Sequence, residues 1–300
     1  MTNSPKVSVV VASGAGGEFL FRCLASLAPQ VARNGAELIV VDRMGEATRR
    51  RIAGEFPSAR VLATPADHRA TVPEMRRIGA LAAGGEIVAV LEEHCTAPEG
   101  WLERIATSFR PDDAAIGGPI LDSSFERLRD WCVFFSEYHN YMPPWPDGER
   151  FALNGANIAY SREKLLRHAD VLDKGYWEVV LHPPLACDGR FRAVGSIGAH
   201  HTGPFDYGYY LRQRYLLSRV WGGTQKSLVP ATKRLVHLAL GPVFPALLFA
   251  RVTSRVLEKR QYLGRYVLTL PLLVPAWFAY TLGEWLGYLL GPGRALEEVE

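Results

Sequence analysis

Two carboxylates and an imidazole follow directly on an apolar segment in the first third of the chain. The segment is Glu86–Leu91, and the polar residues that follow it are Glu92, Glu93 and His94. Carboxylate oxygens and imidazole nitrogens are ligands that divalent cations accept, and such a cation can hold a diphosphate. The residues at this point therefore predict chemistry on a phosphate-bearing ligand.

The elements around this motif predict where it lies in the fold. An unbroken apolar strand is typical of a parallel sheet covered on both faces, and ligands of such sheets bind beyond the carboxyl ends of the strands. The first hundred residues alternate strand and helix patterns, which predicts an α/β fold with a mostly parallel sheet. The predicted strands are Lys6–Ala12, Glu37–Asp42, Arg60–Ala63 and Glu86–Leu91, and the predicted helices are Glu18–Leu27, Glu46–Phe56 and Val72–Ala83.

The middle of the chain has a less regular pattern. Strands are predicted at Ala115–Leu121, Asn154–Tyr160 and Phe191–Ile197. Ser161 should cap a short helix that ends at Leu166, because serine favours the N-cap position. The segment Ser124–Tyr141 has helical spacing, and we expect most of its aromatic side chains to be core residues. Those side chains are Trp131, Phe134, Phe135, Tyr138 and Tyr141.

Composition indicates a globular chain and excludes some classes of function. Hydrophobic residues make up 48% of the 300 residues, which is ample for a core, and the formal net charge of +3 gives no indication of nucleic-acid binding. Four scattered cysteines without a C-x-x-C pair predict reduced thiols in a cytosolic compartment. The N-terminus leads straight into a strand, so no cleavable signal peptide is expected.

The composition changes after about residue 230. Leu235–Ala250 and Tyr266–Leu290 are apolar runs interrupted by prolines, and about 20 apolar residues are needed to span a bilayer. The residues between the runs are strongly basic, which favours the cytoplasmic side of a membrane. We therefore expect 231–300 to form membrane-associated helices, with the first run at the membrane surface or re-entrant. Whether the second run spans is left open, and the alternative is a soluble domain that buries both. The basic residues are Arg251, Arg255, Lys259, Arg260 and Arg265.

An ordered set of short motifs over residues 5–225 resembles the family 2 glycosyltransferases, which have the GT-A fold. The set consists of a strand ending in Ser13, then Arg22-Cys23-Leu24, Ile39–Asp42, Arg76–Gly79 and Leu91–His94. The resemblance implies a catalytic domain over residues 1–230 and a nucleotide-diphosphate-sugar donor. The Gly-rich turn Ser13–Gly17 does not match the G-x-G-x-x-G fingerprint of dinucleotide-binding proteins.

The resemblance assigns donor-site roles residue by residue. Asp42 stands at the position that contacts the nucleotide base, and Ser13 lies in the first nucleotide loop. Arg76 or Arg77 stands where a basic residue approaches the diphosphate, and Glu92 replaces the first Asp of the D-x-D motif, near the ribose. Taken alone, Asp42 would be read as a turn residue at the end of a strand.

The metal position departs from the family pattern. His94 replaces the last Asp of the motif, which is the usual metal ligand, and His201 stands where such enzymes often supply a late ligand. An imidazole suits Mn²⁺ better than Mg²⁺, so the cofactor is expected to be a divalent cation of either kind, with Glu93 as a further candidate ligand. Taken alone, His94 would be a capping or solvated histidine.

The acceptor side is expected downstream. Lys174–Glu178 resembles the segment that carries the catalytic base, so Glu178 is the predicted base, with Asp173 or Asp188 as the alternative. Trp177 is predicted to stack on an acceptor, and Asn154 and Asn157 to contact sugar or diphosphate, although Asn-Gly also favours a turn. Arg212 and Arg214 are predicted to neutralise the departing diphosphate, and a solvated helix face is the alternative.

These features favour a membrane-associated inverting glycosyltransferase. It would transfer a single sugar to a lipid-linked or cell-envelope glycan acceptor at the cytoplasmic face of the membrane. A polymerising enzyme is disfavoured, because the spacing around Arg219 and Trp221 departs from the Q-x-x-R-W segment of processive members. The alternatives are a sugar-phosphate nucleotidyltransferase, disfavoured by the lack of a basic residue in Ser13–Gly17, and a non-catalytic GT-A scaffold at the membrane.

Overall fold

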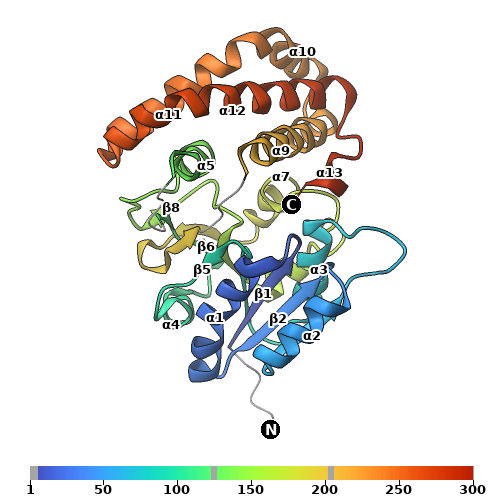
Figure 1. The fold of residues 1–300 in the computed structure, drawn as a ribbon. Coiled ribbons are helices and arrows are strands. Elements are labelled where there is room, and N and C mark those ends of the chain that lie inside the picture. Colours follow the sequence, from blue (N-terminus) through green and yellow to red (C-terminus); the bar gives the residue numbers. More distant parts are fainter. Residues whose placement is uncertain (1–5, 123–126, 202–205, 300) are drawn as a thin grey trace. The chain divides into compact units, whose positions relative to one another are not determined.

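The chain forms two compact units in the computed structural model, which describes residues 6–122, 127–201 and 206–299 (Figure 1). The first, called the sheet unit, comprises residues 1–123 and 144–202, and the second, called the helical unit, comprises 124–143 and 203–300. The division therefore differs from the expected boundary at residue 230. The helix α9, Tyr207–Leu228, belongs to the helical unit together with the apolar segments that follow it.

The sheet unit is built on one eight-stranded, mostly parallel sheet with the order β3-β2-β1-β4-β9-β6-β10-β8. Strands β1 to β4 are parallel neighbours, whereas β9 runs antiparallel between β4 and β6. The strands are β1 (Val7–Ser13), β2 (Glu37–Asp42), β3 (Ala59–Ala63), β4 (Ile87–Leu91), β6 (Asp113–Gly117), β8 (Gly148–Glu149), β9 (Asn157–Ser161) and β10 (Arg190–Ala193). The predicted fold class is confirmed.

Four helices alternate with the strands in the first part of the sheet unit. They are α1 (Gly17–Asn34), α2 (Glu46–Glu55), α3 (Val72–Ala82) and α4 (Trp101–Ser108). Helix α3 begins with a capping box in which Thr71 and Glu74 satisfy each other's backbone N–H groups. It packs on β1 and β2, and Gly79 permits this contact because an added Cβ would lie 2.3 Å from Val10. The sheet core beneath it consists of fully buried side chains such as Val10, Ile39 and Val88.

A second, three-stranded sheet with the order β5-β11-β7 begins directly after the motif Glu92–His94. Its strands are β5 (Cys95–Thr96), β11 (Ala199–His201) and β7 (Ile120–Leu121). The strand predicted over Ala115–Leu121 is thus divided between two sheets. Gly118 lies at the break, where an added Cβ would stand 2.1 Å from the carbonyl oxygen of Ile197. The strand predicted over Phe191–Ile197 is also shorter than expected, because a 3₁₀ turn, Gly195–Ile197, replaces its end.

Three short helices complete the part of the sheet unit that the structure describes. They are α6 (Arg162–Leu166), α7 (Trp177–Val180) and α8 (His182–Leu185). The hydroxyl of Ser161 accepts a hydrogen bond from the backbone N–H of Lys164, so the predicted cap of α6 is confirmed.

The helical unit consists of α5 and the helices of the C-terminal third. They are α5 (Leu128–Tyr138), α9 (Tyr207–Leu228), α10 (Ala231–Leu240), α11 (Phe244–Lys259), α12 (Leu263–Leu290) and α13 (Ala295–Glu298), with a 3₁₀ turn at Gly241–Val243. Helix α12 packs against α5, α9, α10 and α11 (Figure 1). Four aromatic side chains of α5 are buried, as predicted, and residues 124–126 of the expected segment lie outside the described residues.

Helices α9 and α12 cross at small residues. An added Cβ at Gly283 would stand 2.2 Å from the carbonyl oxygen of Tyr215, and one at Gly287 would stand 2.5 Å from that of Arg219. On α9, an added Cβ at Gly222 would meet the carbonyl oxygen of Glu284 at 2.3 Å. Small residues let two helix backbones approach this closely. The crossing therefore tolerates no side chain at these positions.

Within the described residues, two helical stretches are long and apolar enough to cross a membrane, by length and composition. They are Ala231–Lys259, with a mean hydropathy of 1.7, and Leu263–Leu290, with a mean hydropathy of 1.4. Only 11% of the first window is buried, against 39% of the second. The first stretch therefore exposes more of its apolar surface than a core helix of a soluble protein does.

The α9–α12 crossing leads to a stability prediction. The substitution Gly287→Ala should lower the free energy of unfolding by about 2 kcal/mol, because the new methyl group meets backbone atoms that cannot rotate away. Gly264→Ala in the same helix is the matched control, since nothing lies within 4 Å of its added Cβ. The control should be neutral or stabilising, as alanine favours helices over glycine. Thermal unfolding of the full chain in detergent measures both, and equal melting temperatures for the two variants would contradict the prediction.

Candidate functional site

Polar residues at the C-terminal ends of β1, β2 and β4 lie at one edge of the sheet, called here the carboxyl edge. Ser13 ends β1 and stands opposite Asp42, which ends β2. The motif Glu92–His94 follows β4, which is the other neighbour of β1. Parallel neighbours end at the same edge, so three strands deliver their polar residues together.

Asp42 is fully buried and holds the turn that follows β2. Its Oδ1 accepts hydrogen bonds from the hydroxyl of Ser13 at 2.9 Å and from the N–H of Met44 at 3.2 Å. Its Oδ2 accepts from the N–H of Gly45 at 3.1 Å and from the guanidinium of Arg49 at 3.2 Å. These four bonds fill the roughly four lone-pair positions of a carboxylate. A nucleotide base that contacted Asp42 would have to displace one of the four donors.

Glu93 is buried and binds the Gly-rich turn after β1. Its Oε1 accepts hydrogen bonds from the N–H groups of Gly14 and Ala15 at 2.9 and 2.6 Å, and its Oε2 accepts from that of Gly16 at 2.9 Å. Burial raises the pKa of Glu93, while the charge of His94 and the three N–H donors oppose that rise. Three consecutive N–H groups form the kind of concavity that binds an anion, and here the anion is a side chain of the same chain.

His94 and His201 are buried near each other. The strand β5 that begins after His94 pairs with β11, and His201 stands opposite Cys95. The ring centroids of the two histidines are 6.3 Å apart, and the ring of Phe19 lies 5.6 Å from that of His94. Burial, reinforced by His94, lowers the pKa of His201 to about 3. The imidazole of His201 is therefore neutral at pH 7, which is the form that binds metal ions.

The expected ligand set fits a metal ion only in part. No three side chains of His, Cys, Asp or Glu converge as a ligand group in the part of the chain that the structure describes. The two imidazoles are neighbours, with ring centroids 6.3 Å apart, whereas the carboxylate of Glu93 is committed to the turn after β1. His94 and His201 thus stay candidate ligands of a cation that accepts nitrogen, whereas Glu93 is already occupied.

Glu178 and Arg76 meet at a glycine that precedes β9. Oε1 of Glu178 accepts a hydrogen bond from the N–H of Gly155 at 3.0 Å, and an added Cβ at Gly155 would stand 3.0 Å from Nη1 of Arg76. The next residue, Ala156, accepts a hydrogen bond from the N–H of Glu92 at 3.0 Å. The loop Asn154–Ala156 therefore connects Glu178 to the motif after β4. Oε2 of Glu178 is buried and has no hydrogen-bond partner among the described residues.

The prediction that Trp177 stacks on an acceptor is wrong. Its indole is 1% exposed, packs edge-on against the ring of Tyr160 and donates a hydrogen bond to the carbonyl oxygen of Leu172 at 2.7 Å. Apolar residues at helical spacing more often fill a core than bind a ligand, and Trp177 does so here.

Asn157 is also a structural residue, contrary to prediction. It is fully buried, accepts a hydrogen bond from Nε1 of Trp101 at 3.0 Å and donates one to the carbonyl oxygen of Ile197 at 2.7 Å. Asn154 is half-buried, and its side-chain oxygen accepts a hydrogen bond from the N–H of Ala156 at 2.7 Å. That bond is the turn geometry expected of an Asn-Gly sequence.

The remaining predicted arginines differ in their environments. Arg77 is half-buried and lies 3.7 Å from the carboxylate of Asp173. In the helical unit, Arg214 is buried, forms an ion pair with Glu137 at 3.1 Å and lies over the ring of Tyr280. The interior position of Arg214 makes its predicted contact with a diphosphate wrong. Arg212 is exposed and pairs with Glu298, and its predicted role stays a prediction.

A buried Tyr160–His182 pair behind Glu178 was not predicted. The hydroxyl of Tyr160 and Nε2 of His182 are 2.8 Å apart, and both side chains interact electrostatically with Glu178 and Arg76. Burial lowers the pKa of His182 to about 4, so its imidazole is neutral at pH 7. The sequence around His182 gave no sign of this contact, because its partner Tyr160 lies in β9, a different element that is distant in sequence.

Comparison with known proteins identifies the class to which this fold and edge belong. Residues 8–171 match the sequence family described as Glycosyl transferase family 2, so the chain belongs to that family. The chain is 31% identical over 232 residues to polypeptide N-acetylgalactosaminyltransferase 12 of Mus musculus, covering 74% of this chain and 35% of that protein. It is 29% identical over 193 residues to the Homo sapiens protein of the same name, covering 62% and 29%. The chain thus spans about a third of the length of these curated relatives.

Solved structures show the same fold at low sequence identity. A mannosyltransferase from Pyrobaculum calidifontis, PcManGT in complex with GDP-Man and Mn²⁺, has a TM-score of 0.56 and 15% identity, covering 96% of this chain and 88% of that chain. GalNAc-T7 with UDP, GalNAc and Mn²⁺ has a TM-score of 0.51 and 16% identity, covering 68% and 44%. S. aureus TarS 1–349 has a TM-score of 0.50 and 15% identity, covering 94% and 90%. These likenesses confirm the predicted GT-A fold.

The different environments of Glu93, which binds the turn after β1, and of His94, which lies beside His201, lead to a prediction about metal binding. His94→Ala and His201→Ala should each weaken Mn²⁺ binding at least about tenfold, because each would remove a predicted nitrogen ligand. Glu93→Gln should leave Mn²⁺ binding unchanged but lower the free energy of unfolding by about 1–3 kcal/mol, because the amide accepts fewer hydrogen bonds from the turn. Isothermal titration with MnCl₂ and urea unfolding measure the two quantities.

The exposed Glu99→Gln is the matched control for this experiment and should change neither quantity. If Glu93→Gln abolished Mn²⁺ binding, the carboxylate of Glu93 would be a ligand and its assignment to the turn would be incomplete.

The buried His182 leads to a prediction about pH. Its pKa is about 4 in the folded chain and about 6.5 when unfolded, so between these values the unfolded chain binds more protons. The free energy of unfolding should therefore fall as the pH falls from 6.5 to 4. Between pH 6.5 and 4, the free energy of unfolding of the His182→Gln variant should fall by on the order of 2–3 kcal/mol less than that of the wild type. Urea unfolding at a series of pH values measures it.

His68→Gln serves as the contrasting variant, since the hydrogen bonds that the ring of His68 donates to the carboxylates of Glu74 and Asp67 raise the pKa of His68. Removal of His68 should not reduce the decrease in the free energy of unfolding between pH 6.5 and 4. An identical pH dependence in wild type and His182→Gln would show that His182 is not the group responsible.

Proposed function

We propose that this chain transfers a sugar from a nucleotide-diphosphate-sugar donor to an acceptor hydroxyl, with inversion at the anomeric carbon. The observation that carries the proposal is the environment of Glu178. One oxygen of its carboxylate is fixed by Gly155, and the other is buried without a hydrogen-bond partner among the described residues. An unpaired buried oxygen costs about 1–3 kcal/mol, and a hydroxyl that donates to it would remove that cost.

The donor is proposed to bind at the carboxyl edge. Its diphosphate would lie near Arg76, which is buried beside Gly155, and its ribose near Glu92. A mannosyltransferase and a GalNAc-transferase with this fold are described with nucleotides and Mn²⁺, which supports a nucleotide sugar and a divalent cation here. His94 and His201 are the proposed protein ligands of that cation. When bound, the cation would supply positive charge to the diphosphate.

The transfer step needs one base and one stabilised leaving group. In the proposed reaction, Glu178 accepts the proton of the acceptor hydroxyl while the oxygen of that hydroxyl forms the bond to the anomeric carbon. The bond between that carbon and the diphosphate oxygen breaks on the opposite side, and the electron pair leaves with the diphosphate. The guanidinium of Arg76 offsets the charge that develops there. One carboxylate and one displacement give inversion.

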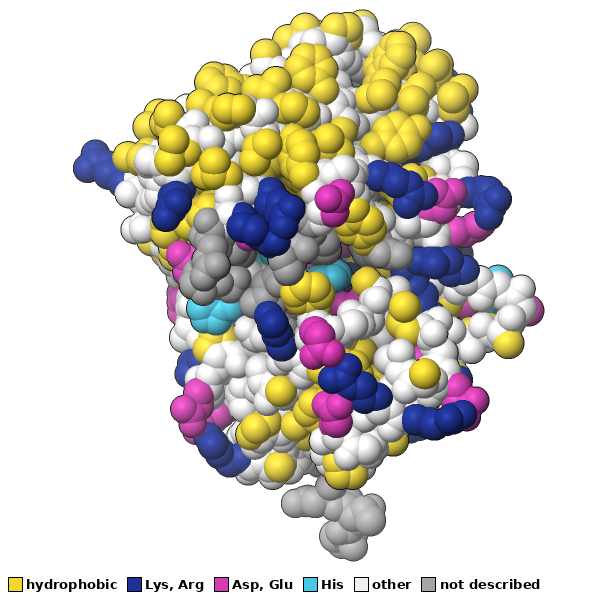
Figure 2. Space-filling model, viewed as in Figure 1, with side chains coloured by type: hydrophobic (Ala, Val, Ile, Leu, Met, Phe, Trp, Pro, Cys, Tyr) yellow, Lys and Arg dark blue, Asp and Glu magenta, His cyan; other side chains and the backbone are white. Residues whose placement is uncertain are grey.

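The acceptor is proposed to be held at a membrane, on its cytoplasmic face, as part of a lipid-linked or cell-envelope glycan. The support is the helical unit, whose α10–α12 expose many apolar side chains to the surface (Figure 2). A chain held at the membrane meets a membrane-held acceptor in two dimensions, where its effective concentration is high.

Substitution of Glu178 tests the function. Glu178→Gln should lower kcat about 10²–10⁴-fold while the KM for the donor stays within about twofold, because the amide keeps the shape but accepts no proton. The measurement is turnover of a panel of UDP- and GDP-sugars with membrane lipid extract as acceptor, together with binding of the same nucleotide sugars in detergent.

Asp173→Asn and Asp188→Asn are the matched controls, since each neutralises a competing carboxylate in the same region. Asp173 is paired with Arg77, and Asp188 accepts a hydrogen bond from His168 at 2.8 Å. Both variants should keep at least about half of the wild-type kcat. Unchanged turnover in Glu178→Gln would remove Glu178 as the base, and failure to bind any nucleotide sugar would overturn the proposed function.

A further inference from the structure

The outer face of the helical unit exposes apolar side chains, whereas hydroxyl side chains lie on its buried face. Helix α12 carries seven apolar side chains that are 43–63% exposed: Val267, Leu268, Val274, Phe278, Leu282, Leu289 and Leu290. Its buried face includes the hydroxyl side chains of Thr269 and Thr281. Between Arg265 and Arg294 the only charged residue is Glu284. A helix on the surface of a soluble protein has the opposite distribution, with its polar side chains outward.

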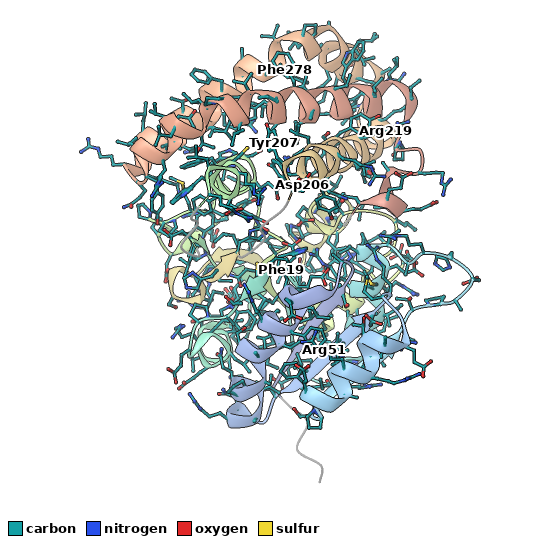
Figure 3. All side chains as sticks on the ribbon, viewed as in Figure 1. Phe19, Arg51, Asp206, Tyr207, Arg219 and Phe278 are labelled. Carbon is teal, nitrogen blue, oxygen red and sulfur yellow. The ribbon has the colours of Figure 1, made fainter. Side chains whose placement is uncertain are left out.

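Helices α10 and α11 extend this apolar surface. Their exposed apolar side chains are Leu235, Val236, Leu240, Leu247, Phe249 and Leu257, with Val243 in the turn between the two helices. Figure 2 shows hydrophobic side chains gathered over α10–α12, and Figure 3 shows Phe278 on α12 within this surface. A contiguous apolar patch of this kind marks an interaction site rather than ordinary exposure.

Charge complementarity identifies a lipid bilayer as the occupant. Basic side chains are concentrated around the turn between α11 and α12, where the exposed ones are Arg251, Arg255, Arg260 and Arg265 and the single acid is Glu258. Basic residues beside an apolar helix face attract anionic lipid head groups.

The packing within the helical unit disfavours a transmembrane arrangement of α12. Helix α5 covers its first turns, where the rings of Phe135 and Tyr266 are 5.3 Å apart. The start of α9 reaches its middle, where the hydroxyl of Tyr207 donates a hydrogen bond to the carbonyl oxygen of Leu272 at 2.6 Å. The middle of α9 covers its later turns, at Gly283 and Gly287, and Lys226 near the end of α9 donates a hydrogen bond to the carbonyl oxygen of Leu289 at 2.9 Å. Helices α5 and α9 thus accompany α12 from one end to the other.

Helix α9 carries charges that a bilayer interior does not accept. They are Arg212, which is exposed and paired with Glu298, and Lys226 near the end of the helix. Each charged residue at the centre of a bilayer costs about 3 kcal/mol. A spanning α12 would also carry the basic turn around Arg260 through the membrane. A helix that lies flat avoids both costs.

We infer that α10–α12 lie in the plane of the membrane and insert their apolar outer face into one leaflet, with anionic lipids bound by the basic turn between α11 and α12. At about 1.5 Å per residue, the 28 residues of α12 extend about 42 Å, longer than the roughly 30 Å hydrocarbon core. Interfacial helices of this length insert by about 5–10 Å. The inference rests on the membrane association in the proposed function and is independent of the sugar chemistry.

Vesicle flotation tests the lipid partner. The full chain should float with vesicles of phosphatidylcholine and phosphatidylglycerol at 3:1, on the order of tenfold more tightly than with phosphatidylcholine alone. Phe278→Ser combined with Leu282→Ser should weaken binding to both kinds of vesicle at least about tenfold. Arg255→Gln combined with Arg260→Gln should remove most of the preference for the anionic vesicles.

Leu81→Ser is the matched control, because Leu81 is an exposed leucine of the sheet unit, and it should bind as wild type does. Absence of flotation with either vesicle would overturn the inference. Nucleotide-sugar binding is measured in detergent on the same samples, so a loss of docking is distinguished from a failure of the proposed function.

Labelling of single cysteines tests the orientation. In a Cys187→Ser background, which removes the exposed native thiol, Gln261→Cys marks the turn before α12 and Glu297→Cys marks the segment after it. With protein added to preformed vesicles, a membrane-impermeant maleimide should label both positions from outside. Labelling of Glu297→Cys alone, with Gln261→Cys reached only after detergent is added, would show that the hairpin spans and would overturn the inference.

Discussion

The carboxyl edge of the sheet unit depends on one buried carboxylate, that of Glu93. It comes from the end of β4 and accepts three N–H groups of the turn after β1, so it joins two neighbouring strands beyond their last ladder bond. Unpaired, each of those buried donors would cost about 1–3 kcal/mol. The same turn begins at Ser13, whose hydroxyl binds Asp42 at the end of β2. The ends of β1, β2 and β4 are therefore joined by one hydrogen-bond network. Glu92 and His94 flank Glu93 at its centre.

The other half of the site depends on the antiparallel strand β9. Because β9 lies between β4 and β6, the loop that precedes it reaches the carboxyl edge, where the carbonyl of Ala156 accepts from the N–H of Glu92. The neighbouring Gly155 holds Glu178 through its N–H. An added Cβ at Gly155 would stand 2.1 Å from the carboxylate, so the absence of a side chain there is what admits Glu178. The proposed base Glu178 and the motif Glu92–His94, which are far apart in sequence, are thus joined through the consecutive residues Gly155 and Ala156.

Local pattern predicted those parts of the molecule that local forces determine. Strand β2 matches its predicted bounds, and the Ser161 cap and the edge position of the motif follow from side-chain preferences that act within a few residues. The antiparallel β9 and the burial of Trp177 could not be predicted, because they depend on contacts between distant segments. Glu93 shows the same limit: its sequence position suits a metal ligand, and only the fold brings three N–H groups to its oxygens. In the helical unit, the apolar runs were evident, whereas the crossing at Gly283 and Gly287 was not.

The commitment of Glu93 determines which cation this edge would suit. Three of its roughly four lone-pair positions accept N–H groups, and a cation at the fourth would lie beside three donors of the same polarity. A cation at the edge would therefore depend on the imidazoles of His94 and His201 and on oxygens of the donor diphosphate. Mg²⁺ prefers oxygen ligands in strict octahedral geometry, whereas Mn²⁺ accepts imidazole as well. The exchange of a motif aspartate for His94, together with the withdrawal of Glu93 into the turn, thus favours Mn²⁺ at this edge.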